Sequence, residues 1–505
     1  MVSVFAFGIY LRTLLPGVGF WDTGEAQTVP HTLSIFHPTG FPTYAMLGWL
    51  WSQLPLGEVA WRMNLLSAVC VALAAGLVTL ISGHLIEERN GRVVAIAAGI
   101  AGAAFAFAAE PWENAVRADV HALNVFFVAL IMWLLFTWRA AERSGTPHAG
   151  RWLAAAALAF GLGMGNHPLV GLMAFAIAPW LFIVDPGIWR RWRLVAVSGG
   201  MLVLGLATYA YIPIRAIVDP EPPLFYARPD TLERLRYLVF AEQFRDLFQN
   251  FEDPFAFLAR KWQKSEEVLA LQLFGPGWLL AAFGAATLAV RRFGAFIFVT
   301  LVVAANLLYS MNFKDGDIDR YYMPAVVAAA PLLGVAIGSL ATICARAVAD
   351  AGRRLTDLSG RRRLARVAAT LVLLLGVIMP AGSLVTNYAR NDRSADFDAE
   401  RWTTSVYRAL PPDSVVVSWW SYSTPLWYSR YVEDVRPDVR IIDERDIIDE
   451  GWGTIDRAIR RFMGERPVFV VPPHWEYAHI VKHYEFQVVA TYPGFTDLLR
   501  ITGVK

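Results

Sequence analysis

Two carboxylates and two histidines lie close together in the segment GFWDTGEAQTVPHTLSIFHPTGFPTY, which covers residues 19–44. Asp22 and Glu25 are three residues apart, so they share one face of a helix that starts at this point. A carboxylate held against an apolar wall has its pKa raised by burial, toward the range in which it can take a proton at neutral pH. The spacing therefore predicts that Asp22 or Glu25 acts as a general base.

A structural role for these residues is also open. An aspartate at the N-cap with a glutamate three residues later forms a capping box, which satisfies unpaired N–H groups of the first helical turn. In the motif HPTGFP, two prolines and a glycine fix the backbone path after His37. For His37 the alternatives are to orient a substrate or to bond nearby backbone as a turn histidine.

Three further clusters of acids and arginines follow along the chain. The first contains Arg117 and Asp119, which also suit a purely structural ion pair. The second contains Arg215, and the third contains Arg320. The third cluster, NFKDGDIDRYYMP, lacks the glycine and distal glutamate of an EF-hand loop, so calcium binding there is not favoured. The clusters cover residues 110–124, 211–223 and 312–324.

The composition shows what kind of elements must position these residues. Of the 505 residues, 56% are hydrophobic and 17% are charged, with a mean hydropathy of +0.41. Soluble globular chains have about 25% charged residues. The net charge of +2 and the lack of a basic, aromatic-laced patch give no support to nucleic-acid binding. Cys70 and Cys344 lie far apart in apolar segments and are expected to be core residues.

Apolar runs long enough to cross a bilayer recur along the chain, so we expect a polytopic membrane protein with about eleven spans. An interfacial helix is expected within 44–54, with Trp49 and Trp51 at headgroup depth. The first run has no basic start or small-residue cleavage motif, so it is expected to be a span. The expected spans are 2–18, 62–84, 93–110, 119–138, 152–165, 168–185, 194–214, 267–290, 293–311, 321–343 and 367–387.

The arginines predict the orientation of these spans. Arginine-rich connections, among them WRRWR at 189–193 and GRRLTDLSGRRRLAR at 352–366, all fall on one side of the predicted topology. The positive-inside rule makes that side cytoplasmic. The loop 19–60 and the tail after 388 then face outward, and so do the three charged clusters.

The tail has a different composition. Short β-branched runs alternate with helical patterns such as GTIDRAIRRFMGE, which predicts a small α/β domain with a largely parallel sheet. His479 and His483 are four residues apart, a spacing that here favours a solvated helix face over a metal site. The expected strands lie in 414–418, 438–442, 467–471 and 486–490.

Acids and arginines from four outward loops suit a pocket for a lipid-linked phosphate beneath an acceptor site. The planar guanidinium of arginine matches phosphate oxygens with paired donors. A facing carboxylate can take a proton from an incoming nucleophile.

Several motifs, in this order, resemble a family of polytopic membrane proteins whose best understood animal member is a protein O-mannosyltransferase of the secretory pathway. DTGE and HPTGFP are followed by RMNLLSA, AVRADVHALN, GLGMGNHPL and GDIDRYYMPA. In the tail, LPPDSVVVS and VEDVRPDVRIID also resemble that family, so the match covers nearly the whole chain. Thr23, Thr39 and Asp119 depart conservatively from the pattern, where Ser, Pro and Glu are commoner.

The family is similar to the GT-C class of membrane glycosyltransferases. The resemblance implies a polyprenyl-phosphate sugar donor, usually of mannose or another hexose, a hydroxyl acceptor and inversion at the anomeric carbon. It implies Asp22 as the base, with Glu25 as competitor, Asp119 at the start of the fourth span and Arg320 as a phosphate ligand. No metal or other cofactor is favoured. Donor and substrate contacts are further expected from His37, Arg117, His167, Arg215 and Tyr321.

The expected fold is therefore mostly α, a transmembrane helical GT-C-type domain over 1–390 and an extracytoplasmic α/β domain over 391–505. The protein is expected in the cell membrane, with its site on the outer face and a protein, lipid or glycan acceptor.

Two other functions are compatible with a chain of this composition. A transporter or flippase would place charges along a path inside the spans, often with an inverted repeat. Here the charges gather in loops on one side, and no inverted repeat is apparent. A receptor-like protein whose tail binds a partner leaves the long polar loop 19–60 unexplained.

Overall fold

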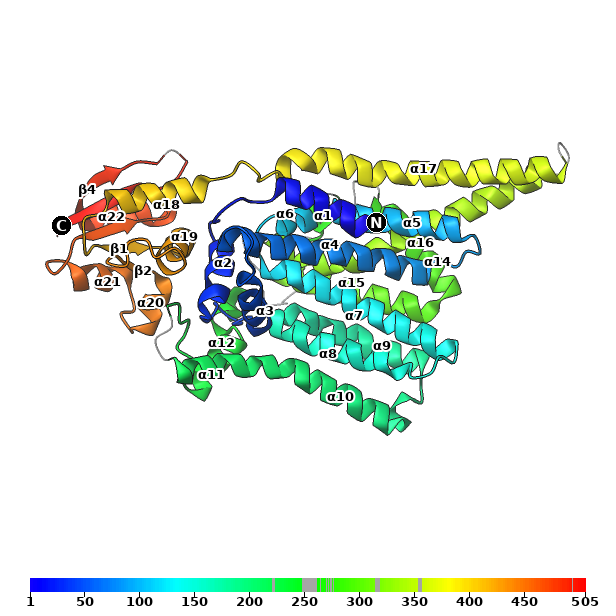
Figure 1. Ribbon diagram of the computed structural model, residues 1–505, viewed down its shortest axis with the longest axis horizontal. Helices are drawn as coiled ribbons and strands as arrows, with labels where there is room; N and C mark the ends of the chain where they lie inside the picture. Colours follow the sequence, from blue (N-terminus) through cyan, green and yellow to red (C-terminus); the bar gives the residue numbers. More distant parts are fainter. Residues whose placement is uncertain are drawn as a thin grey trace.

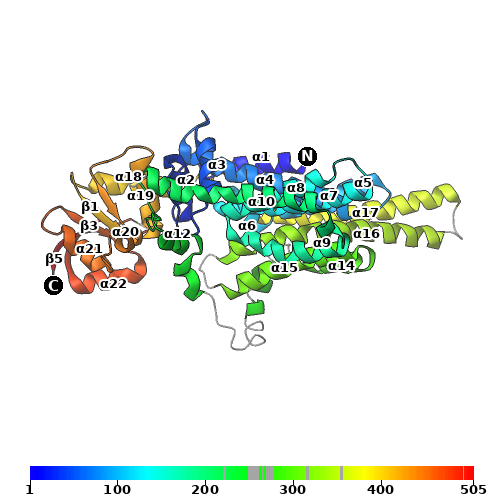
Figure 2. The same cartoon turned by 90° about the horizontal axis from the view of Figure 1, so that it is seen from below.

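The computed structural model describes residues 1–219, 223–247, 261–263, 265–268, 270, 272, 275, 277–313, 318–352, 357–492 and 494–505. It consists of a long bundle of helices and a smaller part with a β-sheet, which lies at one end of the bundle in both views (Figures 1 and 2). The predicted cluster at 312–324 is described only in part, because Lys314–Asp317 lie outside these ranges.

The N-terminal segment forms three helices before the first long one. Helix α1 (Val2–Thr13) is shorter than the predicted span, because Pro16 and Gly17 follow it and residues 14–21 form no helix before α2. Helices α2 (Asp22–Thr32) and α3 (Pro42–Ser52) lie at the end of the bundle that faces the sheet (Figure 1). The helix predicted within 44–54 corresponds to α3.

Each predicted apolar run contains a helix in its described residues, and three further short helices, Ile188–Arg190, Leu232–Val239 and Glu242–Leu247, lie outside those runs. A bilayer favours this because a helix satisfies its own backbone hydrogen bonds. The helices are α4 (Val59–Leu85), α5 (Gly91–Ala106), α6 (Ala109–Ala115), α7 (Val120–Arg143), α8 (Gly150–Asn166), η1 (Pro168–Met173), α9 (Ala174–Val184), η2 (Ile188–Arg190), α10 (Trp192–Leu206), η3 (Ala207–Ala210), α11 (Tyr211–Val218), α12 (Leu232–Val239), η4 (Glu242–Leu247), α14 (Gly277–Arg291), α15 (Phe293–Asn312), η5 (Ile318–Tyr322), α16 (Met323–Ala351) and α17 (Leu358–Asn391).

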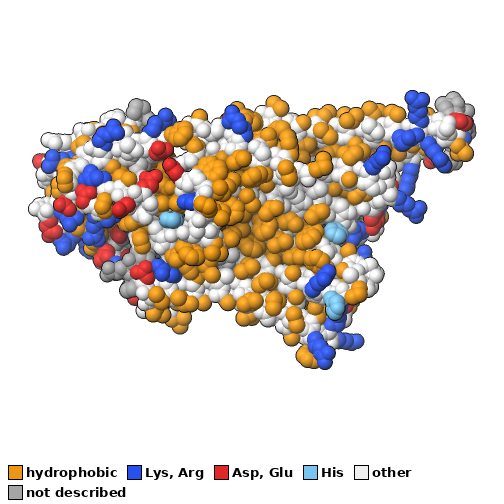
Figure 3. Space-filling model, in the orientation of Figure 1, with side chains coloured by type: hydrophobic (Ala, Val, Ile, Leu, Met, Phe, Trp, Pro, Cys, Tyr) orange, Lys and Arg blue, Asp and Glu red, His pale blue; other side chains and the backbone are white. Residues whose placement is uncertain are grey.

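Among the described residues, six helices are long and apolar enough to cross a membrane, or seven if the bent pair α5–α6 forms one span. Three shorter apolar helices, α1, η1–α9 and α14, accompany them. Apolar side chains cover the middle of the bundle on the face in Figure 3, and Lys and Arg gather at the end away from the sheet. The protein is therefore a multi-pass membrane protein, and the number of about eleven spans stays a prediction.

The C-terminal part contains a five-stranded sheet in the order β2-β1-β3-β5-β4. Strands β1 (Val415–Ser418), β2 (Arg440–Ile442) and β3 (Val468–Val471) are parallel, with Val416 opposite Ile441 and Phe469. β4 (Tyr484–Ala490) and β5 (Leu498–Val504) are antiparallel, and β5 also pairs antiparallel with β3. The sheet is thus mixed, and β5 is an additional strand that the pattern did not predict.

The helices of this part are α18 (Asp398–Ala409), α19 (Trp420–Tyr431), α20 (Glu444–Asp449), α21 (Ile455–Phe462) and α22 (His474–His483). β1 and β3 are buried along their whole length, which explains their unbroken apolar sequences. Helix α19, which follows β1, packs against α2 of the bundle (Figure 1). The division of the chain into domains at 390 stays a prediction.

Candidate active site

The predicted site residues come together around one cavity of about 1080 Å³. The cavity lies where the end of the bundle meets the C-terminal part, because both contribute walls. Eight of the nine predicted residues line it: Asp22, Glu25, His37, Arg117, Asp119, His167, Arg320 and Tyr321.

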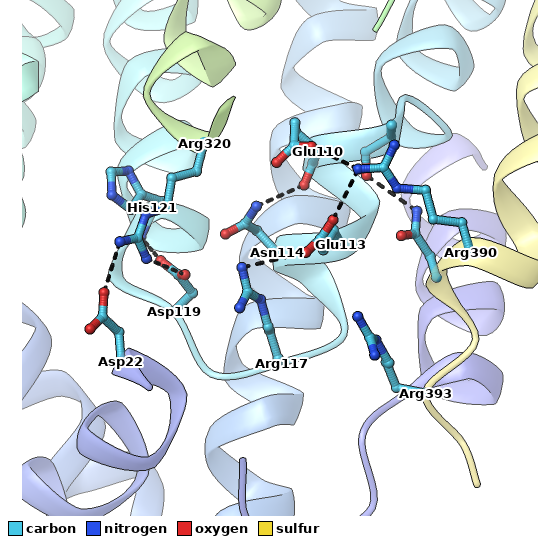
Figure 4. A network of polar contacts seen from close by, with 12 residues as sticks. Asp22, Glu110, Glu113, Asn114, Arg117, Asp119, His121, Arg320, Arg390 and Arg393 are labelled. Atoms are coloured by element: carbon cyan, nitrogen blue, oxygen red, sulfur yellow. Dashed lines mark hydrogen bonds and ion pairs between the residues drawn. The ribbon is translucent and has the colours of Figure 1, made fainter. Parts of the chain in front are cut away.

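Asp22 is the first residue of α2, and both of its carboxylate oxygens accept hydrogen bonds from distant parts of the chain. Arg320 donates to Oδ2 at 2.8 Å (Figure 4), and the indole of Trp420 donates to Oδ1 at 2.8 Å. The capping-box alternative is wrong: Trp21 occupies the N-cap and no side chain caps the helix. The carboxylate is engaged in the cavity instead.

The charge state of Asp22 follows from these contacts. Burial alone would raise the pKa of Asp22. The charges of Arg320 and His37, with the hydrogen bonds from Trp420 and Arg320, outweigh burial and hold the pKa below its ordinary value. Asp22 is therefore ionised and weakly basic.

Glu25 lies one turn further along α2 and is bound by His37 through both carboxylate oxygens. The backbone N–H of His37 donates to Oε1 at 2.9 Å, and Nδ1 of the ring lies 2.5 Å from Oε2. The Glu25 side chain is only 3% exposed, whereas the His37 side chain is 19% exposed. Burial raises the pKa of Glu25, and the neighbouring charge of His37 offsets part of that rise.

Arg320, at the start of the helix pair η5–α16, lies between two carboxylates. Besides Asp22, its guanidinium is 3.5 Å from Oδ2 of Asp119. Asp119 is the N-cap of α7, and its Oδ1 accepts the backbone N–H of His121 at 2.7 Å. Asp22, Arg320 and Asp119 form a charged row (Figure 4), which is buried at Asp119, 2% exposed, and partly open at Asp22, 28% exposed.

Arg117 extends this charged row on its other side. It forms an ion pair of 3.6 Å with Glu113, whose carboxylate also meets Arg390 of α17 at 3.4 Å (Figure 4). The alternative considered for the sequence was a pair between Arg117 and Asp119. In the structure Asp119 pairs with Arg320, and Glu113 pairs with Arg117.

Aromatic rings form the floor of the cavity around His167. Phe41 stacks on the His167 ring at 5.5 Å between centroids, and the His121 ring is 4.7 Å away. The Tyr321 ring lies 4.9 Å from His121 and 5.9 Å from His167. The rings of His167 and Tyr321 therefore lie close together, and His121 is an additional member that the sequence patterns did not single out.

Arg215 is the exception among the predicted site residues, because it is not among the residues that line the cavity. Its Nε donates to the carbonyl of Leu33 at 2.8 Å, and its terminal nitrogen donates to Asp219 at 2.8 Å. Leu33 is the C-cap of α2, so Arg215 supports the helix that carries Asp22 and Glu25. Arg215 was predicted to contact the donor phosphate, and in the structure it supports α2 instead.

The C-terminal part contributes residues that the sequence reasoning missed. Trp420 and Glu444 line the cavity, and the Glu444 carboxylate accepts the backbone N–H of Trp420 at 3.0 Å. Burial raises the pKa of Glu444 to about 7. Both residues begin helices directly after parallel strands, at the carboxyl ends where open α/β sheets bind ligands. That rule is the signal that could have found them.

A metal ion could be held by one group of side chains in the described part of the chain. Ligand atoms of Asp22, Glu25 and His37 lie within 4.8 Å of one another. Binding an ion there would compete with the Glu25–His37 bond and with the cation of Arg320 on Asp22. The expectation that no metal is required stays a prediction.

The fold of the chain resembles that of a solved protein over nearly its whole length. This is ArnT from Cupriavidus metallidurans, solved bound to undecaprenyl phosphate and in the apo state. The TM-score is 0.62, with 15% identity, 99% of this chain covered and 96% of that chain. At this identity the likeness is one of fold.

One family model and two relatives also match parts of the chain. Residues 22–189 match the family described as the protein O-mannosyl-transferase TMEM260 N-terminal domain, so the resemblance found in the sequence is confirmed. The chain is 25% identical to protein O-mannosyl-transferase TMEM260 of Mus musculus, over 88% of this chain and 62% of that protein. It is 21% identical to the Dictyostelium discoideum protein of that name, over 89% and 57%. It thus spans less than two thirds of these relatives' length.

Proposed function

We propose that the protein is a membrane glycosyltransferase that moves a hexose from a polyprenyl-phosphate donor to a hydroxyl acceptor with inversion. Mannose is the first candidate, since the relatives are named protein O-mannosyl-transferases. A polyprenyl-phosphate donor is supported by the ArnT fold, because ArnT was solved with undecaprenyl phosphate. The acceptor class includes Ser or Thr of a protein, a lipid and a glycan.

The observation that carries this proposal is the cavity in which Arg320 lies beside the first acidic turn of α2. A guanidinium offers paired N–H donors that match a phosphate, and Arg117 adds a second cation to the same lining. Asp22, Glu25 and His37 line the same cavity as these cations. One cavity thus combines a place for a leaving phosphate with groups that can remove a proton.

In the proposed reaction the acceptor hydroxyl gives its proton to a basic side chain of the cavity, and its oxygen attacks C1 of the sugar from the face opposite the phosphate. The C1–O bond to the phosphate breaks, and its electron pair goes to the leaving lipid phosphate. Arg320 stabilises the charge that develops there. His37, His167 and Tyr321 orient the two substrates, and the step needs no metal.

The orientation of the protein follows from charge. The arginine-rich segment around 357–366 begins α17 at the end away from the sheet (Figures 1 and 3). The positive-inside rule places that end in the cytoplasm. We therefore place the cavity and residues 391–505 on the extracytoplasmic side, where the C-terminal part covers the acceptor side of the site.

The first test uses purified protein in lipid with radiolabelled polyprenyl-phosphate mannose, and compares wild type with Asp22→Asn. We expect wild type to release mannose to water or an acceptor. Asp22→Asn should lose roughly 100- to 10,000-fold in rate, because it disrupts the acidic group beside Arg320. His31→Gln is the matched control, since His31 lies on the same helix and is not in the cavity lining. No turnover by wild type with any of several sugars would contradict the function.

A further inference from the structure

Asp22, Glu25 and His37 are the three candidate proton acceptors. They differ in which of their polar atoms are already bound by other protein groups. Asp22 uses one oxygen for Trp420 and the other for Arg320. Glu25 uses one oxygen for the His37 backbone and the other for the His37 ring. Each carboxylate is therefore engaged on both oxygens by protein groups.

His37 differs because only one of its two ring nitrogens is engaged. Nδ1 faces Glu25, and among the described residues Nε2 makes no hydrogen bond. When a carboxylate accepts from Nδ1–H, the neutral imidazole carries its lone pair on Nε2. The ring is part of the cavity lining, so that lone pair is available to a substrate.

The ring is also held in place on two sides. The Phe41 ring meets it edge-on at 5.0 Å between centroids, and the Trp420 ring does so at 5.4 Å. Together with the two bonds to Glu25, these contacts restrict rotation of the imidazole. A base held in one orientation loses little freedom when the substrate binds.

We propose that Nε2 of His37 accepts the proton of the acceptor hydroxyl, and that Glu25 is the positioning residue behind it. This proposal rests on the glycosyl transfer proposed above. As the acceptor O–H bond breaks, its proton goes to Nε2 and its oxygen forms the bond to C1. The phosphate leaves with the C1–O electron pair. The imidazolium that forms is stabilised by the Glu25 carboxylate.

Asp22 then has a separate task. It binds Arg320 through Oδ2, and so positions the cation that the leaving phosphate requires. Loss of activity in Asp22→Asn is therefore compatible with either base, and other variants must separate them.

The pH dependence of the rate shows whether His37 is the base. The charged groups that face His37 are Glu25 and Asp22 of α2 and Arg320 of η5, and Glu444 and Arg445 of α20 line the same cavity. Burial lowers the pKa of His37, but the charge and hydrogen bond of Glu25, together with the charge of Asp22, outweigh it, and the net pKa is raised. A His37 base must be neutral, so the rate should rise as the pH passes that raised pKa.

The experiment measures kcat against pH for His37→Gln, His37→Ala and Glu25→Gln, with His31→Gln as control. We expect His37→Gln to lose roughly 100- to 10,000-fold in kcat while the KM for polyprenyl-phosphate mannose stays close to wild type. Added imidazole should restore part of the rate to His37→Ala. In Glu25→Gln the loss of the negative charge lowers the pKa of His37. The acidic limb of the profile, where kcat rises with pH, should therefore move to lower pH.

Two results would overturn the proposal while leaving the transferase activity intact. One is near-wild-type kcat in His37→Gln. The other is an inactive His37→Ala that imidazole does not rescue, together with an acidic limb that disappears in Glu25→Gln, which would make Glu25 the base. Absence of turnover in wild type is a different outcome, because it contradicts the glycosyl transfer itself and this proposal with it.

Discussion

At the scale of single residues, the site is organised around the guanidinium of Arg320 and the indole of Trp420, which both bind Asp22. The first residue is 298 positions from Asp22 and the second 398. Neither contact follows from local spacing. Asp22, Glu25 and Asp119 could be singled out from sequence because acids at the ends of apolar runs are costly unless they are paired or functional.

Residues of one type in similar sequence surroundings can have different roles in the structure. Arg215 resembles Arg320 in the sequence, since both sit in charged clusters beside apolar runs. The structure turns Arg215 toward the carbonyl of Leu33 and keeps it out of the cavity lining. Which way a side chain points depends on tertiary packing, and a single sequence contains no record of that.

Trp420→Phe tests the hydrogen bond to Asp22 while it keeps an aromatic ring against His37. A hydrogen bond to a charged group contributes about 1.5–3 kcal/mol. If that energy is needed in the transition state, kcat should fall roughly 10- to 100-fold. The measurement is turnover of the labelled donor. Trp475→Phe, an exposed tryptophan of α22, serves as the control. Equal kcat in Trp420→Phe and wild type would show that Asp22 does not need this donor.

At the scale of elements, the helices were largely predictable and the sheet was less so. Long apolar runs leave the backbone little choice in a membrane, so each predicted span contains a helix. Strand β5, LLRITGV, was missed because it alternates weakly and depends on pairing with β3 and β4. Helix ends were displaced where prolines and glycines follow, as after α1.

Close packing of α8 against α10 is a feature of elements that a variant can test. A Cβ added to Gly161 would lie 2.4 Å from the carbonyl oxygen of Leu202, so Gly161→Ala must push the two helices apart. Overpacking of this kind costs typically about 1–3 kcal/mol. We expect a lower midpoint of thermal unfolding in detergent. Gly199→Ala is the control on α10, because a Cβ there meets nothing within 4 Å. Equal midpoints for the two variants would refute the close contact.

At the scale of the whole molecule, the charge pattern and the position of the sheet make one prediction about topology. We expect Ser359, in the arginine-rich segment, to face the cytoplasm and Glu485, on β4, to face outward. Cys70 and Cys344 are first replaced by Ala. Ser359→Cys and Glu485→Cys are then treated in intact cells with a membrane-impermeant maleimide. Glu485→Cys should be labelled directly, and Ser359→Cys only after permeabilisation. The reverse pattern would invert the proposed orientation.

The bond between Trp420 and Asp22 also has a consequence for the order of events during synthesis. The acidic turn of α2 leaves the ribosome well before the indole that binds it and the carboxylate of Glu444 that accepts from the Trp420 backbone. The helical bundle alone therefore lacks one wall of the cavity. A chain that has been made only up to α17 has an unfinished site, and the site is completed only when the segment that carries Trp420 and Glu444 has folded and docked on α2.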